Sequence, residues 1–404
     1  MTENRLAGAD LVRALACLMV LAHHVAQRVS PRVLEPGQIK AATLVTMGSL
    51  GVCAFFVLSG FLLSRPFWAA MEKGEQMPSL RTYTIRRAAR ILPGFWLALT
   101  VAFLMSFTIL KFPFSGELVL RYLSGLFGVS AFHWLTWFPV EFDQPLWSIG
   151  AEIFSYALLG LALLLVFKLP FRSWGARVVW LAVIAAVLGG QYLLQTYGVP
   201  DSAGRGWEHG SVGGAKFWWP NYNPIAFFAM FAVGVFAASL QVWVAKYRNV
   251  AFDLLALGGF VFAAWQLVAY GPDSSAYGLL NIPYAYPWFP IGVGVVLLAM
   301  PSSVFLRGLS ENPLVAYVAR VSFGVYVWHY FLMEIVRVVW VPQYVYWGMR
   351  DIGQWAWISA GVVVAAFVIA TISYYLLEEP VIRWARTLER RSMPDAPTLS
   401  PAAG

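Results

Sequence analysis

The sequence predicts an all-α protein, a polytopic integral membrane helical bundle of about ten transmembrane helices with both termini in the cytoplasm. Of its 404 residues, 60% are hydrophobic and only 12% are charged, which is about half the charged content of soluble domains. The apolar runs do not alternate with polar residues as the strands of a membrane β-barrel do. Because lipid offers no partner to open backbone groups, these runs must be helices. The composition excludes a disordered chain, a nucleic-acid partner and an ordinary soluble enzyme.

Ten apolar runs have the roughly 17 to 25 residues that cross a bilayer. They lie near 9–29, 43–64, 91–110, 146–167, 177–197, 224–244, 251–270, 284–300, 313–339 and 354–377. An even number of spans places both termini on one side. The segment from Leu118 to Phe132 is apolar but short and contains Arg121. We expect it to be interfacial or re-entrant, with one additional span as the alternative.

The distribution of cations orients the bundle. About 18 Lys and Arg residues fall in the N-terminal tail, the 65–90 and 168–177 loops, the 246–248 turn, at Arg307 and in the C-terminal tail, and about eight fall in the opposite loops. The positive-inside rule therefore predicts that both termini are cytoplasmic. The first span has charges close to it and a second span after it, so we expect it to remain as an anchor.

One integral membrane domain over 1–384 is the simplest partition, followed by a cytoplasmic tail over 385–404 that is rich in Pro, Ala and Ser and is predicted to be disordered. No internal repeat is visible, and outer loops of about 25 to 35 residues leave no expected extracytoplasmic domain. Cys17 and Cys53 each lie in an apolar run, which indicates two packed, reduced thiols and neither a disulfide framework nor a metal site.

Arg13 and His24 share the first span. Eleven residues at about 100° each make three turns plus about 20°, so the two side chains lie on one helix face about 16 Å apart. Lining an internal pathway would explain both, because exposure to lipid is costly for either group. A snorkelling Arg and an interfacial His are the alternative. His23 is on a different face and serves as a control residue.

The second span and the loop after it contain a proline and an arginine cluster. Pro66 is expected to end the second span at Arg65. The following loop ends in Arg86, Arg87 and Arg90, which we expect to surround a site at the cytoplasmic mouth. Guanidinium groups bind phosphates through planar, bidentate forks. Topology-setting charge or contact with anionic lipid explains the cluster equally well.

The fourth span places Glu152 inside an otherwise apolar helix near its outer end, and an intramembrane carboxylate is a candidate functional group. Trp147, Ser148, Ile149 and Tyr156 are candidates for the same pocket, although a Trp near the interface is often only part of the aromatic belt.

In the ninth span, Ser322, Tyr326 and His329 form one polar stripe at i, i+4 and i+7. Substrate contact and a structural hydrogen-bond network explain this stripe about equally. Glu378 and Glu379 close the last span, and we expect them to pair with the arginine cluster in a structural role.

Together and in this order, these fragments resemble the membrane-bound acyltransferase-3 family, which includes O-antigen and peptidoglycan O-acetylases, nodulation-factor acetylases and macrolide acyltransferases. The matching elements are Arg13 with His24, FFVLSGF (55–61), RRxxRIxP (86–93), WSxxxE with FxY (147–156), SFxxYxxH (322–329) and ExP (378–380). Three departures are small: AGADLVR ends at Arg13 where Leu-Asp-Gly-Leu-Arg is usual, Phe95 stands where Tyr is common, and Ile153 stands where a second carboxylate beside Glu152 is frequent.

The resemblance implies transfer of an acyl group, usually acetyl, from cytoplasmic acyl-CoA to a hydroxyl, often on a sugar presented outside. No cofactor is implied to be bound permanently, because acetyl-CoA or another acyl-CoA is the donor substrate. The implied location is the inner (plasma) membrane of a bacterium. A separate extracytoplasmic partner that receives the acyl group is the alternative to complete transfer by this chain.

Set beside the resemblance, the residues suggest roles. Arg86, Arg87 and Arg90 hold the CoA phosphates, and Arg13 continues the cationic path inward. His24 acts as the base on the acceptor hydroxyl and Glu152 orients it, as the acid does in a catalytic triad. Ser322, Tyr326 or His329 donates to the developing oxyanion.

Three alternatives remain open at this stage. An acyl-histidine intermediate on His24 competes with direct transfer. A macrolide or other secondary metabolite competes with a surface carbohydrate as the acceptor. A transporter or flippase without catalysis, or a structural protein, competes with the enzyme.

Overall fold

The computed structural model describes residues 6–170, 173–269 and 277–391, and this part of the chain contains helices and no β-strand. In chain order the α-helices are α1 (Ala9–Ala26), α2 (Pro36–Thr46), α3 (Leu50–Lys73), α4 (Leu80–Thr108), α5 (Gly116–Leu126), α6 (Trp147–Lys168), α7 (Ser173–Tyr197), α8 (Gly210–Trp218), α9 (Pro224–Val244), α10 (Val250–Ala269), α11 (Trp288–Ala299), α12 (Pro313–Val339), α13 (Ile352–Ser373) and α14 (Glu379–Arg391). A π-helical turn, Tyr374–Glu378, joins α13 to α14. The predicted all-α class is confirmed.

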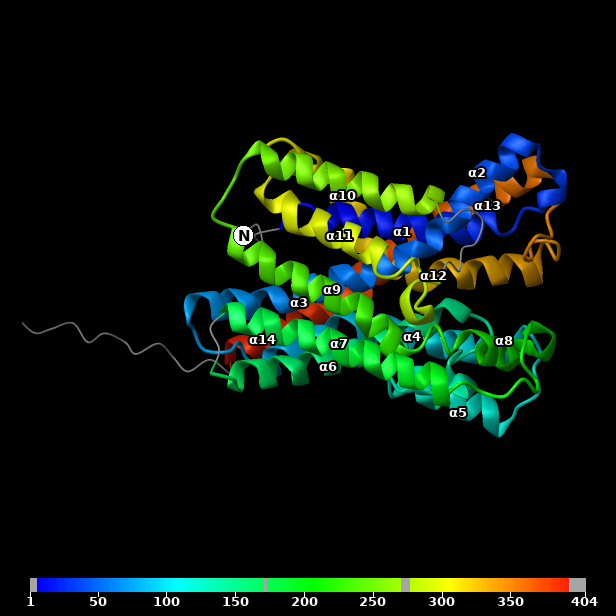
Figure 1. Cartoon of the computed structure of the whole chain (residues 1–404). Helices are drawn as coiled ribbons and strands as arrows, with labels where there is room; N and C mark the ends of the chain where they lie inside the picture. Colours follow the sequence, from blue (N-terminus) through cyan, green and yellow to red (C-terminus); the bar gives the residue numbers. More distant parts are fainter. Residues whose placement is uncertain (1–5, 171–172, 270–276, 392–404) are drawn as a thin grey trace, which may run out of the picture.

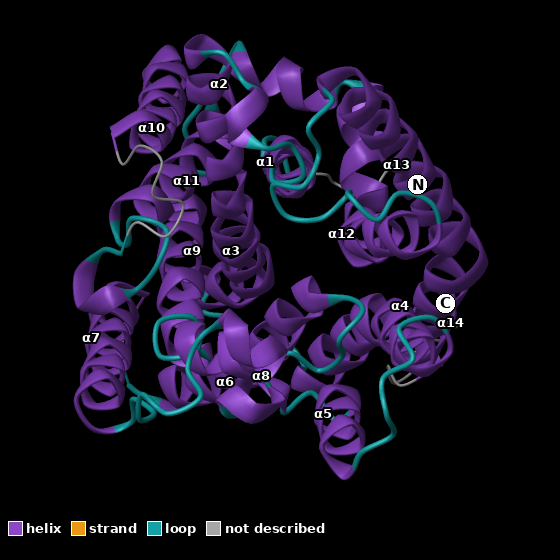
Figure 2. Cartoon of the chain, turned by 90° about the vertical axis from the view of Figure 1, so that its right-hand side faces the viewer, coloured by secondary structure: helices purple, strands orange, loops and turns teal. Residues whose placement is uncertain are grey.

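The long helices run side by side and form one bundle (Figure 1). The N-terminus and α14 lie at one end of the bundle, on the left of Figure 1, and α5 and α8 lie at the other. Seen along the bundle, α3 and α9 occupy its middle, with α1 and α12 on one side and α6 on the other (Figure 2). The start and the last described helix of the chain therefore share an end, as an even number of spans requires.

The tightest helix pair is α3 with α9. A Cβ atom added at Gly60 would lie 2.1 Å from the Phe231 carbonyl oxygen, and one added at Gly234 would lie 1.9 Å from the Val57 carbonyl oxygen. The two glycines thus let the two backbones approach to a distance that no larger residue permits. A Cβ at Gly51 would similarly lie 2.4 Å from the Ala16 carbonyl oxygen of α1. Close packing against α3 therefore fixes the helix that carries Arg13 and His24.

Eight helical segments among the described residues are long and apolar enough to cross a membrane. They correspond to the first seven predicted spans and the tenth. The eighth predicted span is the short apolar segment Trp288–Ser302. The ninth is α12, whose 27 residues reach about 40 Å but whose Tyr, Trp and His residues make it less apolar. The predicted segment at Leu118–Phe132 contains α5, which at 11 residues is too short to span.

Two boundary predictions around the second and third spans are wrong. Pro66 does not end its helix, because α3 continues to Lys73. The exposed proline ring costs one backbone hydrogen bond, and burial of Phe67 and Trp68, each 2% exposed, holds the next turn in place. The arginine cluster lies on α4 and not in a loop, since α4 begins at Leu80 after the Ser79 cap, whose side chain accepts from Thr82 N at 3.3 Å.

Candidate active site

Two histidines from distant parts of the chain form a hydrogen-bonded pair. His24 Nδ1 of α1 lies 3.0 Å from His329 Nε2 of α12, although the two residues are 305 positions apart. His24 Nδ1 also lies 3.1 Å from the Val20 carbonyl oxygen. His329 Nδ1 lies 3.0 Å from the Val325 carbonyl and 2.7 Å from the Tyr326 carbonyl. Three of the four ring nitrogens are therefore engaged, and His24 Nε2 is the fourth.

The partners of each nitrogen assign the tautomers. Carbonyl oxygens only accept, so His329 Nδ1 carries a proton and, in the neutral ring, His329 Nε2 is an acceptor. His24 Nδ1 then donates to His329 Nε2 and to the Val20 carbonyl. This leaves the lone pair of His24 on Nε2, in a half-buried side chain. A neutral imidazole held this way is suited to accept a proton from a substrate.

His23 has a different environment, as expected from its place on the helix. It is 8% exposed, and its Nδ1 contacts the carbonyl oxygen of Thr46 at the end of α2. Although its ring meets that of His24 edge to face at 4.8 Å, none of its described hydrogen bonds reaches His329. His23 is therefore a usable control for His24.

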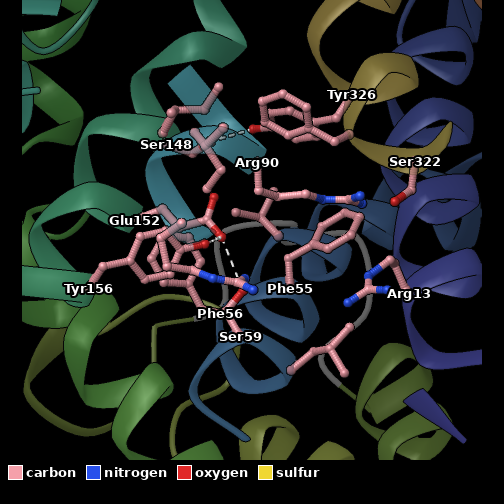
Figure 3. Close-up of a pocket in the computed structure, with 16 residues that line it drawn as sticks. Arg13, Phe55, Phe56, Ser59, Arg90, Ser148, Glu152, Tyr156, Ser322 and Tyr326 are labelled. Carbon is pink, nitrogen blue, oxygen red and sulfur yellow. Dashed lines mark hydrogen bonds between the residues drawn. The ribbon is translucent and has the colours of Figure 1, made fainter. Parts of the chain in front are cut away.

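A cavity lies between α1, α3, α4, α6 and α12, and nine of the thirteen candidate residues line it (Figure 3). These residues are Arg13, Arg87, Arg90, Ser148, Ile149, Glu152, Tyr156, Ser322 and Tyr326. Its volume of about 90 Å³ is enough for a small acyl group. His24, Arg86, Trp147 and His329 are not part of its lining.

Glu152 forms the polar centre of the α6 side of this cavity. Ser59 Oγ of α3 donates to Glu152 Oε1 at 3.0 Å, and the Tyr156 hydroxyl donates to the same oxygen. Figure 3 shows these groups facing Arg13 across the cavity. The expected pairing of Glu152 with His24 is wrong, because the described hydrogen bonds of His24 go to Val20 and His329. Glu152 and Tyr156 are four positions apart on one helix face, which explains their own contact.

Two oxyanion candidates already have partners. The Tyr326 hydroxyl donates to the Pro145 carbonyl at 3.0 Å and lies 2.6 Å from Ser148 Oγ. Ser322 Oγ donates to the Ala319 carbonyl of its own helix at 2.9 Å. The Tyr326 contacts join α12 to the start of α6, and the Ser322 contact lies within α12. The structural explanation of the polar stripe thus accounts for both hydroxyls.

The cavity and the histidine pair are neighbours along α12. The Tyr326 ring lines the cavity, and its centroid lies 6.0 Å from that of His329. The His329 ring in turn lies 5.0 Å from that of His24. The His24 side chain is thus two ring contacts away from the cavity that contains the arginines.

The arginine cluster divides between the cavity and the surface. Arg87 and Arg90 line the cavity, whereas Arg86 is exposed on α4. Arg13 Nη1 lies 3.5 Å from Asp10 Oδ1. Three guanidinium groups therefore converge on a cavity that contains one carboxylate, which favours an anionic ligand.

Trp147 and the two glutamates of the last span have other surroundings. The Trp147 ring lies 4.7 Å from that of Trp137 and 5.1 Å from that of Phe227, so it packs in an aromatic cluster. Glu379 accepts from Arg383 Nη2 at 2.7 Å on its own helix, and not from the arginine cluster as expected. Glu378 is 1% exposed and neither of its carboxylate oxygens has a described hydrogen-bond partner, but it interacts electrostatically with Arg90 of the cluster, as expected.

Sequence reasoning missed the ion pair behind the histidines. Arg28, 4% exposed, donates from Nη2 to Glu334 Oε1 at 3.1 Å and from Nη1 to the Tyr344 carbonyl at 2.9 Å. Its guanidinium carbon lies 5.0 Å from the centroid of the Tyr330 ring, which meets the His24 ring edge to face at 5.2 Å. A charged residue inside the apolar ninth span was the available signal for Glu334. The ion pair thus packs beside His24 through the Tyr330 ring.

A buried carboxylate lies just before α6. Asp143 is fully buried and neither of its oxygens has a hydrogen-bond partner among the described residues. Burial and the nearby Glu334 carboxylate raise the pKa of Asp143 well above its ordinary value of 3.8. Asp143 therefore retains its proton beyond the pH range in which an exposed aspartate loses it.

These features define a multi-pass membrane protein with an arginine-lined cavity next to a histidine whose Nε2 is available as a base. The acyltransferase-3 family model, described as an acyltransferase domain, matches residues 6–376. The chain therefore belongs to the acyltransferase-3 family.

Named relatives in bacteria agree with this assignment. Acyltransferase MdmB of Streptomyces mycarofaciens is 31% identical over 194 residues, 46% of this chain and 45% of that protein. Peptidoglycan O-acetyltransferase OatA of Listeria monocytogenes is 26% identical over 400 residues, 92% of this chain and 55% of that protein. Putative peptidoglycan O-acetyltransferase YrhL of Bacillus subtilis is 24% identical over 391 residues, 93% and 54% of the two chains. The chain thus spans about half the length of these relatives.

Proposed function

We propose that the protein is a membrane O-acyltransferase of the bacterial plasma membrane that moves an acyl group, in the first place acetyl, from cytoplasmic acyl-CoA to a hydroxyl of a cell-surface carbohydrate. The observation that carries the proposal is the assigned tautomer of His24, whose Nε2 takes no part in the described hydrogen bonds. His24 lies two ring contacts away from the cavity lined by Arg13, Arg87 and Arg90. The names of two relatives, which are peptidoglycan O-acetyltransferases, support a saccharide acceptor.

The donor is proposed to enter from the end of the bundle that holds α14. The phosphates of CoA carry several negative charges, and Arg87 and Arg90 are placed to bind them with charge-assisted hydrogen bonds. Arg13 extends this positive surface toward the thioester.

Transfer then needs one base. His24 Nε2 takes the proton of the acceptor hydroxyl as its oxygen attacks the thioester carbonyl carbon, and a new C–O bond forms. The tetrahedral intermediate collapses with cleavage of the C–S bond, and His24 returns the proton to the departing thiolate. The products are the ester and CoA with a free thiol. Holding both substrates in place supplies much of the rate acceleration.

The test is release of CoA from acetyl-CoA by the purified protein in lipid nanodiscs, with pooled saccharide acceptors. His24→Asn is compared with the matched control His23→Asn, in which the amide retains a donor to the Thr46 carbonyl. The wild type and His23→Asn are expected to release CoA, and His24→Asn to be slower by about 10²-fold or more. Equal rates for the two variants, in folded samples, would refute the role of His24.

The same samples address the alternatives. A transporter or flippase moves its cargo without CoA release, so an acetyl-CoA-independent activity of the wild type would replace the proposal. An acyl-histidine route has an acyl group bound covalently to His24, which mass spectrometry after rapid acid quenching would detect. Its detection would contradict direct transfer while leaving the enzyme class intact.

A further inference from the structure

A second cavity opens at the end of the bundle that holds α5 and α8, opposite α14 (Figure 1). It lies between α5, the 134–141 segment, the 203–209 loop and α8, and its lining includes Glu117, Trp134, Glu141, Ser211 and Lys216. Its volume of about 600 Å³ is within the range of small-ligand sites. The proposed donor and base do not use this site.

The polar groups of this cavity are held in place from behind. Glu141 accepts from Arg121 Nη1 and from Ser211 Oγ, one at each carboxylate oxygen. Arg121 is 1% exposed and also donates from Nε to the Phe138 carbonyl at 2.8 Å. A carboxylate has about four acceptor positions, so Glu141 can accept further bonds from a ligand. The buried Arg121 holds this carboxylate in its orientation.

The opposite wall supplies a fixed donor and exposed backbone. Lys216, 8% exposed, donates from Nζ to Asp201 and to the Ala203 carbonyl, which leaves one of its three N–H groups. Its ammonium nitrogen lies 5.3 Å from the centroid of the Trp134 ring. Gly204 and Gly210, both with φ near +70°, belong to the lining, so backbone groups there are not screened by side chains.

This set of groups fits one chemical class best. Acyl-CoA needs several cations for its phosphates, but here two carboxylates, Glu117 and Glu141, accompany the single ammonium of Lys216. A mainly apolar acceptor would leave these fixed polar groups without partners, which is costly. Sugar hydroxyls both donate and accept, so they satisfy carboxylate, ammonium and backbone groups at once. We propose that this outer cavity, defined by Glu117, Trp134, Glu141, Ser211 and Lys216, binds the saccharide that receives the acyl group.

The proposal rests on the proposed transferase function and deepens it. The two cavities share one partition, the segment 141–148. Glu141 lines the outer cavity and Ser148 the inner one. Between them, Gln144 Nε2 lies 3.5 Å from Ser211 Oγ, and the Phe142 ring lies 5.1 Å from that of Phe331 on α12. A saccharide held in the outer cavity is thus on the opposite side of the partition from the arginines.

The experiment blocks the outer cavity covalently. Cys17 and Cys53 are both buried, so Ser211→Cys introduces an accessible thiol, and Ala41→Cys on exposed α2 at the same end is the matched control. Membrane fragments that contain the native acceptors, and whose two faces are both open to solution, receive a bulky maleimide and then radiolabelled acetyl-CoA. Transfer of label to saccharide is measured, together with binding of acetyl-CoA to each purified variant in nanodiscs.

Labelled Ser211→Cys is expected to lose about 10-fold or more of its acetyl transfer, while its affinity for acetyl-CoA and the activity of labelled Ala41→Cys are unchanged. Undiminished transfer after complete labelling would overturn the outer site, as would a parallel loss of acetyl-CoA binding. Mass spectrometry of the product separates a polymeric from a lipid-linked saccharide, and a product without any saccharide would overturn the acceptor class. If the wild type transfers no acetyl group to any molecule, the proposed function itself fails.

Discussion

Replacement of His329 tests whether this residue orients the base or contacts the reacting atoms. His329 has no free ring nitrogen, because Nδ1 contacts two carbonyls and Nε2 accepts from His24. His329→Ala removes the acceptor 3.0 Å from His24 Nδ1 and leaves the Val20 carbonyl at 3.1 Å. One of the two contacts that hold the tautomer thus survives, so the base is loosened and not abolished.

The size of the effect follows from this partial loss. A general base contributes about 10²- to 10⁴-fold to the rate, and loss of a residue that orients another catalytic group typically costs about 10- to 100-fold. We therefore expect His329→Ala to lower kcat by about 10- to 100-fold, or about 1.4 to 2.7 kcal/mol. KM for acyl-CoA should change little, because His329 is not among the residues that line the arginine cavity.

Steady-state CoA release in nanodiscs measures both constants. His329→Gln is the matched control, since its amide oxygen can accept from His24 Nδ1 near the position of the lost nitrogen, and it should recover part of kcat. If His329→Ala retains the kcat of the wild type while His24→Asn is inactive, His329 does not orient His24. If KM for acyl-CoA rises and kcat is constant, His329 contacts the donor, and the assigned tautomer is irrelevant to the reaction.

Three further predictions concern donor binding, packing and pH. Arg87→Ala should weaken acetyl-CoA binding by about 10- to 100-fold, the range for a lost charge-assisted hydrogen bond. Replacement of the exposed Arg86 by Ala should have a smaller effect. Equal losses of affinity in a binding titration would contradict the division of the arginine cluster between cavity and surface. Gly234→Ala should destabilise the fold by about 1 to 3 kcal/mol because its Cβ would lie 1.9 Å from the Val57 carbonyl oxygen. Gly258→Ala on α10, with open space around it, should be neutral or stabilising. Thermal unfolding of both variants in nanodiscs measures the difference in stability. Burial raises the pKa of Asp143 in the folded protein above 3.8. The stability that the protonated Asp143 contributes is therefore complete below pH 3.8 and is lost as the pH rises toward the folded pKa. Asp143→Asn should be more stable than the wild type at neutral pH and not at pH 4, and a difference that does not depend on pH would refute this.

The helix boundaries that the sequence predicted best are those with strong local signals. The spans 224–244 and 313–339 coincide with α9 and α12. In both, an Asn caps the helix and a Pro occupies the first turn: Asn223 accepts from Ile225 N and Ala226 N, and Asn312 from Leu314 N. Such signals act within four residues, so they are readable without the fold.

Boundaries that depend on distant contacts were mispredicted. Pro66 has the local signature of a helix end, yet α3 continues because Phe67 and Trp68 bury their side chains in the core. The same limit applies to the site. Helix periodicity predicted that Arg13 and His24 line one pathway, and only Arg13 lines the cavity. Of the polar stripe on α12, Ser322 and Tyr326 line the cavity and His329 does not. No periodicity relates His24 to a residue 305 positions away, so the identity of its partner required the packing of α1 on α12.

The partner of His24 changes the chemistry expected at the base. In a triad, a carboxylate stabilises the imidazolium that forms when the base takes a proton, and Glu152 was the expected carboxylate. Here the partner is the imidazole of His329, and the nearby Arg28 is already paired with Glu334. A neutral partner stabilises the positive charge less, so an imidazolium at His24 is a high-energy state. In the proposed direct transfer His24 holds this proton only until the thiolate leaves, which is our reason for proposing it over an accumulating acyl-histidine.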